Sequence, residues 1–181
     1  YIMIDETFDL PVPNVMNKKI INYLGEQPWS YGSDNDTKYK NSFYDIVSNP
    51  LIKDSGQTIV SYLKHGQYRN DLTLNFFGEY IFSLIQERSK FKIKDLGRLY
   101  WNLYTPSSES KSHFDDGNVG KFISAVYNLH TNDGGTQIEN EFIPSKEGQV
   151  IIFKSEKIHK AIAPKTNNLR LSLNIIMELN V

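Results

Sequence analysis

Two histidines and one aspartate in this 181-residue chain have the types and the spacing of metal ligands. His113 and Asp115 are separated by a single residue, so in extended backbone their side chains point to the same side. His159 follows the apolar run at residues 150–153, and antiparallel strands can return it to the first two side chains. Two imidazoles and one carboxylate on one side of a metal leave open positions and suit non-haem Fe(II). The pattern therefore predicts that His113, Asp115 and His159 form a catalytic metal site.

Each of these ligands has a simpler explanation when it is taken alone. A His-x-Asp pair is frequent by chance and usually lies on the surface, while a single histidine such as His159 is more often a hydrogen-bonded core residue. His113, however, follows the polar segment 107–111, and the mouth of a site is expected in such a loop. Because the chain has no cysteine, its metal ligands are restricted to His, Asp and Glu.

Arg170 lies 11 positions after His159, in a segment that alternates leucines with polar residues. If the leucines pack in a core, Arg170 and Ser172 share the other face of the strand. An arginine on an enclosed polar face needs an anionic partner, and its planar fork matches a carboxylate. For Arg170 alone, a solvated position on an exposed strand face is the alternative.

Alternating and apolar runs predict that the second half of the chain is β. Strands are expected at residues 99–104, 121–129, 136–142, 149–153, 159–163 and 169–179. Turn residues separate these runs closely, which is typical of a β-sandwich or barrel.

The first half carries helical signals. Helices are expected at residues 14–25, with Asn14 as the cap and Gly25 as the end, at 57–64, and at 74–87. The aromatic and polar segment 29–40 is expected to be a loop that folds over the substrate as a lid.

The expected organisation is a single domain over residues 1–181, mainly β with helices packed on one outer face. Residues 1–95 would supply helical support and the lid, and residues 96–181 the β core with the metal site. The net charge of −1 gives no bulk attraction to nucleic acid or acidic membranes. No signal peptide or membrane-spanning run is evident, so a cytoplasmic location in a bacterium or a phage-infected cell is expected.

These pieces, in this order, resemble the Fe(II)- and 2-oxoglutarate-dependent oxygenases, most closely the prolyl-4-hydroxylase-like branch and its short bacterial and phage members. Besides the metal motif and Arg170, the resemblance rests on segments 102–106, 125–129, 131–136 and 148–153. It implies a double-stranded β-helix, a cupin-like jelly-roll with the metal between two sheets. It also implies Fe(II), 2-oxoglutarate as cosubstrate and O2, with ascorbate as a further candidate cofactor.

By this resemblance the metal triad binds iron, and Arg170 pairs with the far carboxylate of 2-oxoglutarate. Tyr104 and Ser172 would donate hydroxyl groups to the cosubstrate, and Asn102 is a weaker candidate on the strand face of Tyr104. Relatives often carry a second tyrosine on the strand after the metal motif, where this chain has Asn128. Asn128 is therefore a candidate for that role, and this departure leaves the rest of the cosubstrate pocket open.

The implied activity is hydroxylation of a C–H bond, first of all in a prolyl residue of a peptide or protein, with release of succinate and CO2. Hydroxylation of a free amino acid or another small molecule is the alternative. Repair of nucleic acid is disfavoured, because such members usually carry a second arginine shortly after the first and residues 171–181 contain none. A non-catalytic ligand-binding jelly-roll and a hydrolytic zinc site are alternatives from other classes.

Overall fold

The computed structural model describes residues 4–27, 29–31, 40–41, 57–63, 67–68, 71–166 and 169–180. Its helices are α1 (Asn14–Gly25) and α3 (Leu72–Arg88). The strands in chain order are β1 (Glu6–Asp9), β2 (Trp29–Tyr31), β3 (Lys40–Asn41), β4 (Gln57–Leu63), β5 (Gln67–Tyr68), β6 (Ile93–Tyr104), β7 (Phe122–Asn128), β8 (Gly135–Ile138), β9 (Glu141–Pro144), β10 (Gln149–Lys154), β11 (His159–Ile162) and β12 (Arg170–Leu179). Within these ranges, no helix is both long enough and apolar enough to cross a membrane.

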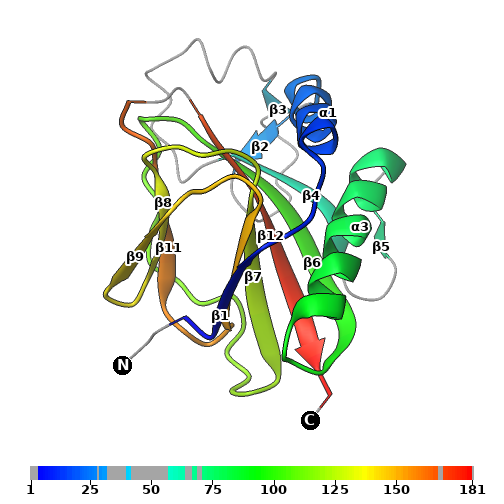
Figure 1. Cartoon of the computed structure of the whole chain (residues 1–181). Coiled ribbons are helices and arrows are strands. Elements are labelled where there is room, and N and C mark those ends of the chain that lie inside the picture. The colour runs from blue at the N-terminus through cyan, green and yellow to red at the C-terminus, as the bar shows by residue number, and fades with distance from the viewer. Residues whose placement is uncertain are drawn as a thin grey trace.

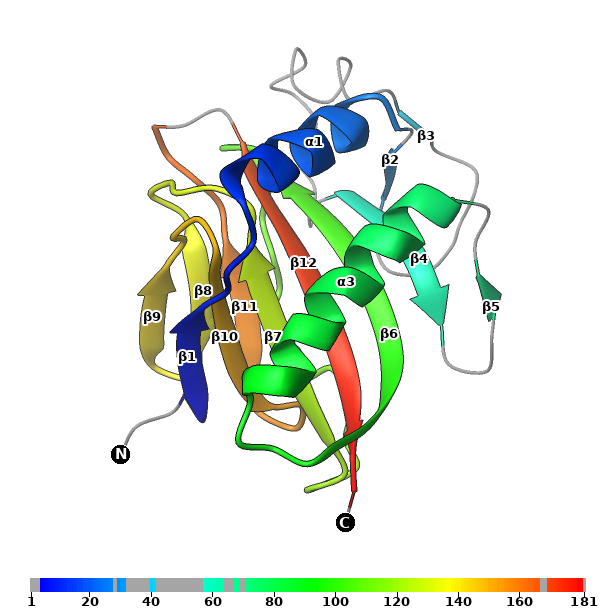
Figure 2. The same cartoon turned by 45° about the vertical axis from the view of Figure 1, so that its right-hand side comes forward.

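The strands form two antiparallel sheets. The larger sheet has the order β1-β10-β7-β12-β6-β4-β2-β3, with β5 beside β4, and the smaller has the order β11-β8-β9. The small sheet lies on one side of β7 and β12, and both helices lie on the other side (Figure 1). Figure 2 shows α3 running across β12 and β6. The predicted architecture, a mainly β jelly-roll with helices on an outer face, is confirmed.

Alternation along β12 separates two interior environments. The core beneath the helices contains every second residue of β12 together with residues of α3: Leu171, Leu173, Ile175, Met177, Ile81 and Ile85. Arg170, Ser172 and Asn174 alternate with these residues and face the small sheet. Burial of one large aliphatic side chain is worth roughly 1.5–3 kcal/mol, so a one-residue slip of β12 would be strongly destabilising. The apolar face therefore fixes which side chains enter the space between the sheets.

Most of the predicted elements are present, and two of them differ from the prediction. The helix predicted at 57–64 is wrong, because this segment is β4 and pairs with β6. Its run of β-branched residues, Thr58, Ile59 and Val60, favours a strand, and so short an apolar run does not distinguish the two structures by periodicity. The single strand predicted at 136–142 is also wrong, since Glu139, with φ of 51°, turns the chain between β8 and β9.

The predicted first helix is confirmed as α1, but its start differs in detail. Pro13 rather than Asn14 occupies the cap, and the carbonyl of Pro13 accepts hydrogen bonds from the N–H groups of Met16 and Asn17 at 2.8 and 3.2 Å. The predicted lid lies largely outside the described residues, because only its ends are described. These ends, β2 and β3, pair with each other. A lid over 29–40 stays a prediction.

Helix α1 is attached to the large sheet by a buried hydrogen bond. The hydroxyl of Tyr127 on β7 donates to Oδ1 of Asn17 at 2.7 Å. Both residues are almost fully buried, and burial raises the pKa of the Tyr127 hydroxyl. Removing the donor would leave a buried acceptor unsatisfied, which is costly.

We expect Tyr127→Phe to lower the free energy of unfolding by about 1–3 kcal/mol, because Asn17 loses its donor. Urea denaturation measures the change, and a double-mutant cycle with Asn17→Ala should show coupling between the two sites. Because the pKa of Tyr127 is raised in the folded state, the unfolded state loses the tyrosine proton at a lower pH. The free energy of unfolding of the wild type should therefore decrease as pH rises above about 10. Tyr127→Phe has no such proton and should lack this contribution to the decrease. Additive effects of the two substitutions would contradict the prediction.

Candidate functional site

His113 and His159 are joined through their backbones. They form an isolated antiparallel bridge in which each N–H donates to the carbonyl of the other residue, at 2.9 and 2.8 Å. The bridge places the two imidazole rings 4.5 Å apart. Asp115 completes the group, and the ligand atoms of the three residues all lie within 4.8 Å of one another. The structure thus brings the predicted triad together.

Each imidazole is held through its Nδ1 atom. Nδ1 of His113 lies 3.0 Å from the carbonyl oxygen of Lys111, and Nδ1 of His159 lies 3.0 Å from that of Lys157. A carbonyl oxygen only accepts, so both Nδ1 atoms carry the proton when the rings are neutral. Nε2 of each ring then presents a lone pair, which is the form that binds a metal.

Burial favours the neutral form of His159, whose Nε2 atom lies beside the Asp115 carboxylate. Removal from water lowers the pKa of His159, although the Asp115 carboxylate and the hydrogen bond to the Lys157 carbonyl oppose this shift. Nε2 of His159 lies 3.4 Å from Oδ2 of Asp115, in a geometry that does not make a hydrogen bond. Two buried lone pairs that face each other are unfavourable unless they share a cation. The donor set therefore fits a divalent metal such as Fe(II).

Asp115 is held by donors that the sequence patterns do not single out. Its Oδ1 accepts from Nη2 of Arg98 at 3.0 Å. Its Oδ2 accepts from the Ser124 hydroxyl at 2.7 Å and, at the limit of 3.5 Å, from Nδ2 of Asn174. Arg98 shares one face of β6 with Tyr104, so the period of two along the strand is the signal that could have found it.

Arg170 is a buried cation without a carboxylate partner in the described part of the chain. It is 1% exposed, its Nη2 donates to the Thr136 hydroxyl at 2.9 Å, and its Nε has no hydrogen-bond partner among the described residues. The guanidinium carbon lies 5.4 Å from the centre of the Tyr104 ring. Burial lowers the pKa of Arg170 to about 10, so the side chain stays charged at neutral pH. A buried guanidinium with unused donors favours an anionic ligand.

Tyr104 remains a hydroxyl donor beside this cation. Burial raises the pKa of Tyr104, although the positive charge of Arg170 opposes the shift. Tyr104 lies opposite Arg170 in the register of β6 and β12, and Asn102 lies opposite Ser172. The pairing of these two strands therefore gathers four of the predicted cosubstrate residues.

One pocket between the sheets contains both the histidines and the arginine. It includes about 330 Å³ of space outside the protein atoms, counting the part open to solvent. Its lining comprises predicted site residues and four others: Asn102, Tyr104, His113, His159, Arg170 and Ser172, with Val126, Thr136, Ala161 and Asn174. The pocket thus places two of the possible metal ligands and the buried guanidinium where one small ligand could contact both.

Asn128 is not among the residues that line this pocket. It is buried at the end of β7, in register with Ser172, and its amide atoms have no hydrogen-bond partner among the described residues. The role of Asn128 at the cosubstrate stays a prediction.

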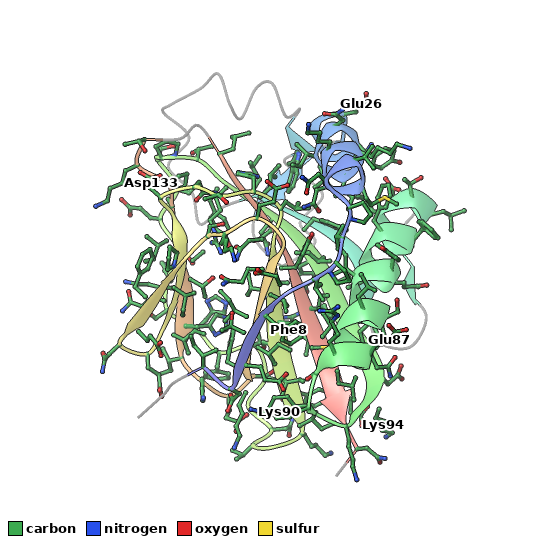
Figure 3. The ribbon with its side chains drawn as sticks, in the orientation of Figure 1. Phe8, Glu26, Glu87, Lys90, Lys94 and Asp133 are labelled. Atoms are coloured by element: carbon green, nitrogen blue, oxygen red, sulfur yellow. The ribbon has the colours of Figure 1, made fainter. Side chains whose placement is uncertain are left out.

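The loop before β12 is tied to the loop after β7. Asp133, labelled in Figure 3, accepts from the N–H groups of Lys165 and Thr166 at 3.1 and 2.9 Å and from the Thr166 hydroxyl at 2.7 Å. These bonds hold Lys165 and Thr166, which precede β12 in the chain.

No family model and no curated protein matches this chain. Solved structures do match it over nearly its whole length. A prolyl-4-hydroxylase of Pseudomonas putida is 14% identical, with a TM-score of 0.56, over 97% of this chain and 92% of that one. A prolyl hydroxylase from Trichoplax adhaerens, in complex with a peptide fragment of the hypoxia inducible factor oxygen degradation domain, is 12% identical with a TM-score of 0.57, over 97% and 83%. A non-haem α-ketoglutarate-dependent epimerase from nogalamycin biosynthesis is 11% identical with a TM-score of 0.63, over 95% and 78%.

The chain has the fold of the 2-oxoglutarate- and Fe(II)-dependent oxygenases. This likeness confirms the fold that the sequence motifs led us to expect. The similar solved structures include both hydroxylases and an epimerase. The fold therefore does not specify the reaction, which has to be argued from the residues of the site.

Replacing Arg170 by Met should leave the thermal stability of the ligand-free protein unchanged or raise it, because an unpaired buried charge is removed. We expect 2-oxoglutarate with Mn(II) to raise the melting temperature of the wild type and to leave that of this variant unchanged. Thermal denaturation with and without these ligands measures both effects. The exposed Arg88→Met is the matched control and should respond as the wild type does. A large loss of stability in ligand-free Arg170→Met would mean that Arg170 is a structural residue.

Proposed function

We propose that this chain is an Fe(II)- and 2-oxoglutarate-dependent oxygenase. The observation that carries the proposal is the buried Arg170, unpaired by any carboxylate in the described residues, in the pocket that also contains His113 and His159. A non-catalytic binding domain has no need of a metal site beside such a cation. A hydrolytic zinc site would leave Arg170 unexplained. 2-Oxoglutarate would account for both the metal ligands and Arg170, because it offers metal-binding oxygens at one end and a free carboxylate at the other.

The roles follow from the contacts of each side chain. His113, Asp115 and His159 would hold the metal, and Arg170 would bind the far carboxylate of 2-oxoglutarate. Hydroxyl groups near Arg170 would complete that site: Tyr104, Thr136 and Ser172. Bound iron supplies the activation of O2, coupled to oxidative decarboxylation of 2-oxoglutarate. Each turnover would convert one O2, one 2-oxoglutarate and one substrate C–H group into succinate, CO2 and a C–OH group.

A prolyl residue in a peptide or protein is the first candidate for the substrate. The fold is shared with two prolyl hydroxylases, one of them solved with a peptide. In addition, residue His113 is exposed, which would leave the proposed metal site open to a polypeptide approaching from solvent. A small molecule is the second candidate, favoured by the likeness to an epimerase of nogalamycin biosynthesis.

Anaerobic addition of Fe(II) and 2-oxoglutarate to the wild type should produce a weak visible charge-transfer band. We expect the band to disappear in His113→Ala, which lacks a ligand, and to persist in Ser112→Ala, which changes the exposed neighbour. Admission of O2 should then release succinate from the wild type and from Ser112→Ala only. If the wild type shows neither the band nor succinate, the oxygenase proposal is wrong.

Peptides that contain proline should increase succinate release and gain the mass of one oxygen atom, as measured by mass spectrometry. The same peptides with alanine in place of proline are the control and should gain nothing. Oxygen transfer to a free amino acid, with every peptide unchanged, would reject the peptidyl substrate in favour of the small-molecule candidate.

A further inference from the structure

We propose that Arg98 is a positioning residue that holds Asp115 as a one-oxygen metal ligand. This inference rests on the proposed metal site and adds to it a residue that the sequence motifs do not include. Arg98 does not line the pocket, and it would act through the carboxylate that it contacts.

The two oxygens of Asp115 have different partners. Oδ1 lies 3.0 Å from Nη2 of Arg98. Oδ2 lies 3.4 Å from Nε2 of His159 and accepts from Ser124 at 2.7 Å. Oδ2 of Asp115 is therefore the oxygen that would bind the metal, while Oδ1 stays in the ion pair with Arg98. Rotation of the carboxylate to present Oδ1, or both oxygens, would break the ion pair with Arg98.

The guanidinium is itself held in place. Its central carbon lies 4.2 Å from the centre of the Tyr100 ring on the same face of β6. Arg98 is only partly exposed, at 26% of its side chain, and the Asp115 side chain is almost fully buried, at 3%. An ion pair with one buried member and a stacked guanidinium is screened less than a surface pair. The stack and the burial together favour one orientation of the carboxylate.

Close packing at the neighbouring residue also fixes the strand. A Cβ atom at Gly97 would lie 2.9 Å from the backbone carbonyl oxygen of Ile176. Strands β6 and β12 therefore approach each other closely beside Arg98, which is paired with Ile176. The point from which Arg98 reaches Asp115 is therefore set by backbone packing as well as by side-chain contacts.

The positive charge of Arg98 and its effect on the orientation of Asp115 predict opposite changes in metal affinity when Arg98 is replaced. Its positive charge repels a metal cation, so loss of charge alone would tighten metal binding. Loss of orientation would instead weaken binding, and outer contacts of this kind typically change metal affinity by about 10–100-fold. Because the geometry shows a fully formed contact to Oδ1, we expect orientation to dominate.

The test uses Co(II), which has visible absorption bands that report its ligands. We expect Arg98→Gln to raise the Kd for Co(II) by about tenfold or more and to shift the bands. Arg98→Lys retains the charge but not the planar fork, and it should also bind Co(II) more weakly than the wild type. If charge alone mattered, Arg98→Gln would bind more tightly and Arg98→Lys would match the wild type.

Lys94→Gln is the matched control. Lys94 forms an ion pair of the same 3.0 Å length, with Glu178, but its side chain is 57% exposed. Figure 3 shows Lys94 near the C-terminal end of β12. Lys94→Gln should leave the affinity and the spectrum unchanged, and urea denaturation of the metal-free variants checks that Arg98→Gln and Arg98→Lys are folded.

The outcomes separate the two proposals. If the wild type binds Co(II) and its bands respond to 2-oxoglutarate, but both Arg98 variants bind with wild-type affinity and spectrum, the role of Arg98 is rejected and the proposed function stands. If the wild type itself binds neither Co(II) nor 2-oxoglutarate, both proposals are rejected. Weaker Co(II) binding in folded Arg98→Gln and Arg98→Lys, with Lys94→Gln unchanged, supports the positioning role.

Discussion

The alternation of apolar and polar residues along β12 is the constraint on which the rest of the structure depends. One face of this strand is packed under the helices, with Leu173 and Ile175 fully buried. Because the side-chain period of a strand is two, that packing also directs Arg170 and Ser172 into the space between the sheets. The apolar core thus supplies the stabilisation that allows a charged residue to be buried where it can meet a ligand.

The space between the sheets is polar in a way that folding alone does not explain. Arg170 has a hydroxyl but no carboxylate partner in the described residues, and Nε2 of His159 lies 3.4 Å from a carboxylate oxygen of Asp115 with no hydrogen bond between them. Both arrangements oppose stability in the absence of ligand. A cation between His159 and Asp115 and an anion at Arg170 would relieve both, and this complementarity is the strongest physical link between the structure and the proposed chemistry.

Much of the fold and part of the site were predictable from the sequence. Apolar alternation predicted most strands of the jelly-roll, and the spacing of His113 and Asp115 predicted two side chains that the fold brings beside His159. The sequence does not distinguish helix from strand at residues 57–64, because a short apolar run fits either period and the pairing of this segment with β6 is a long-range property. The contact of Arg98 with Asp115 is likewise a long-range property, because only the folded chain brings these two residues together.

The sequence by itself determined the types of ligand, the order of the strands along the chain and the alternation that pairs a buried face with a polar one. These are local properties, set by side-chain chemistry and by the period of two. Only the tertiary structure decided that His113 and His159 bridge through their backbones, that Arg170 lacks a carboxylate partner in the described residues, and that each oxygen of Asp115 has its own partner. Those facts depend on register and packing between distant segments, which local sequence patterns do not specify.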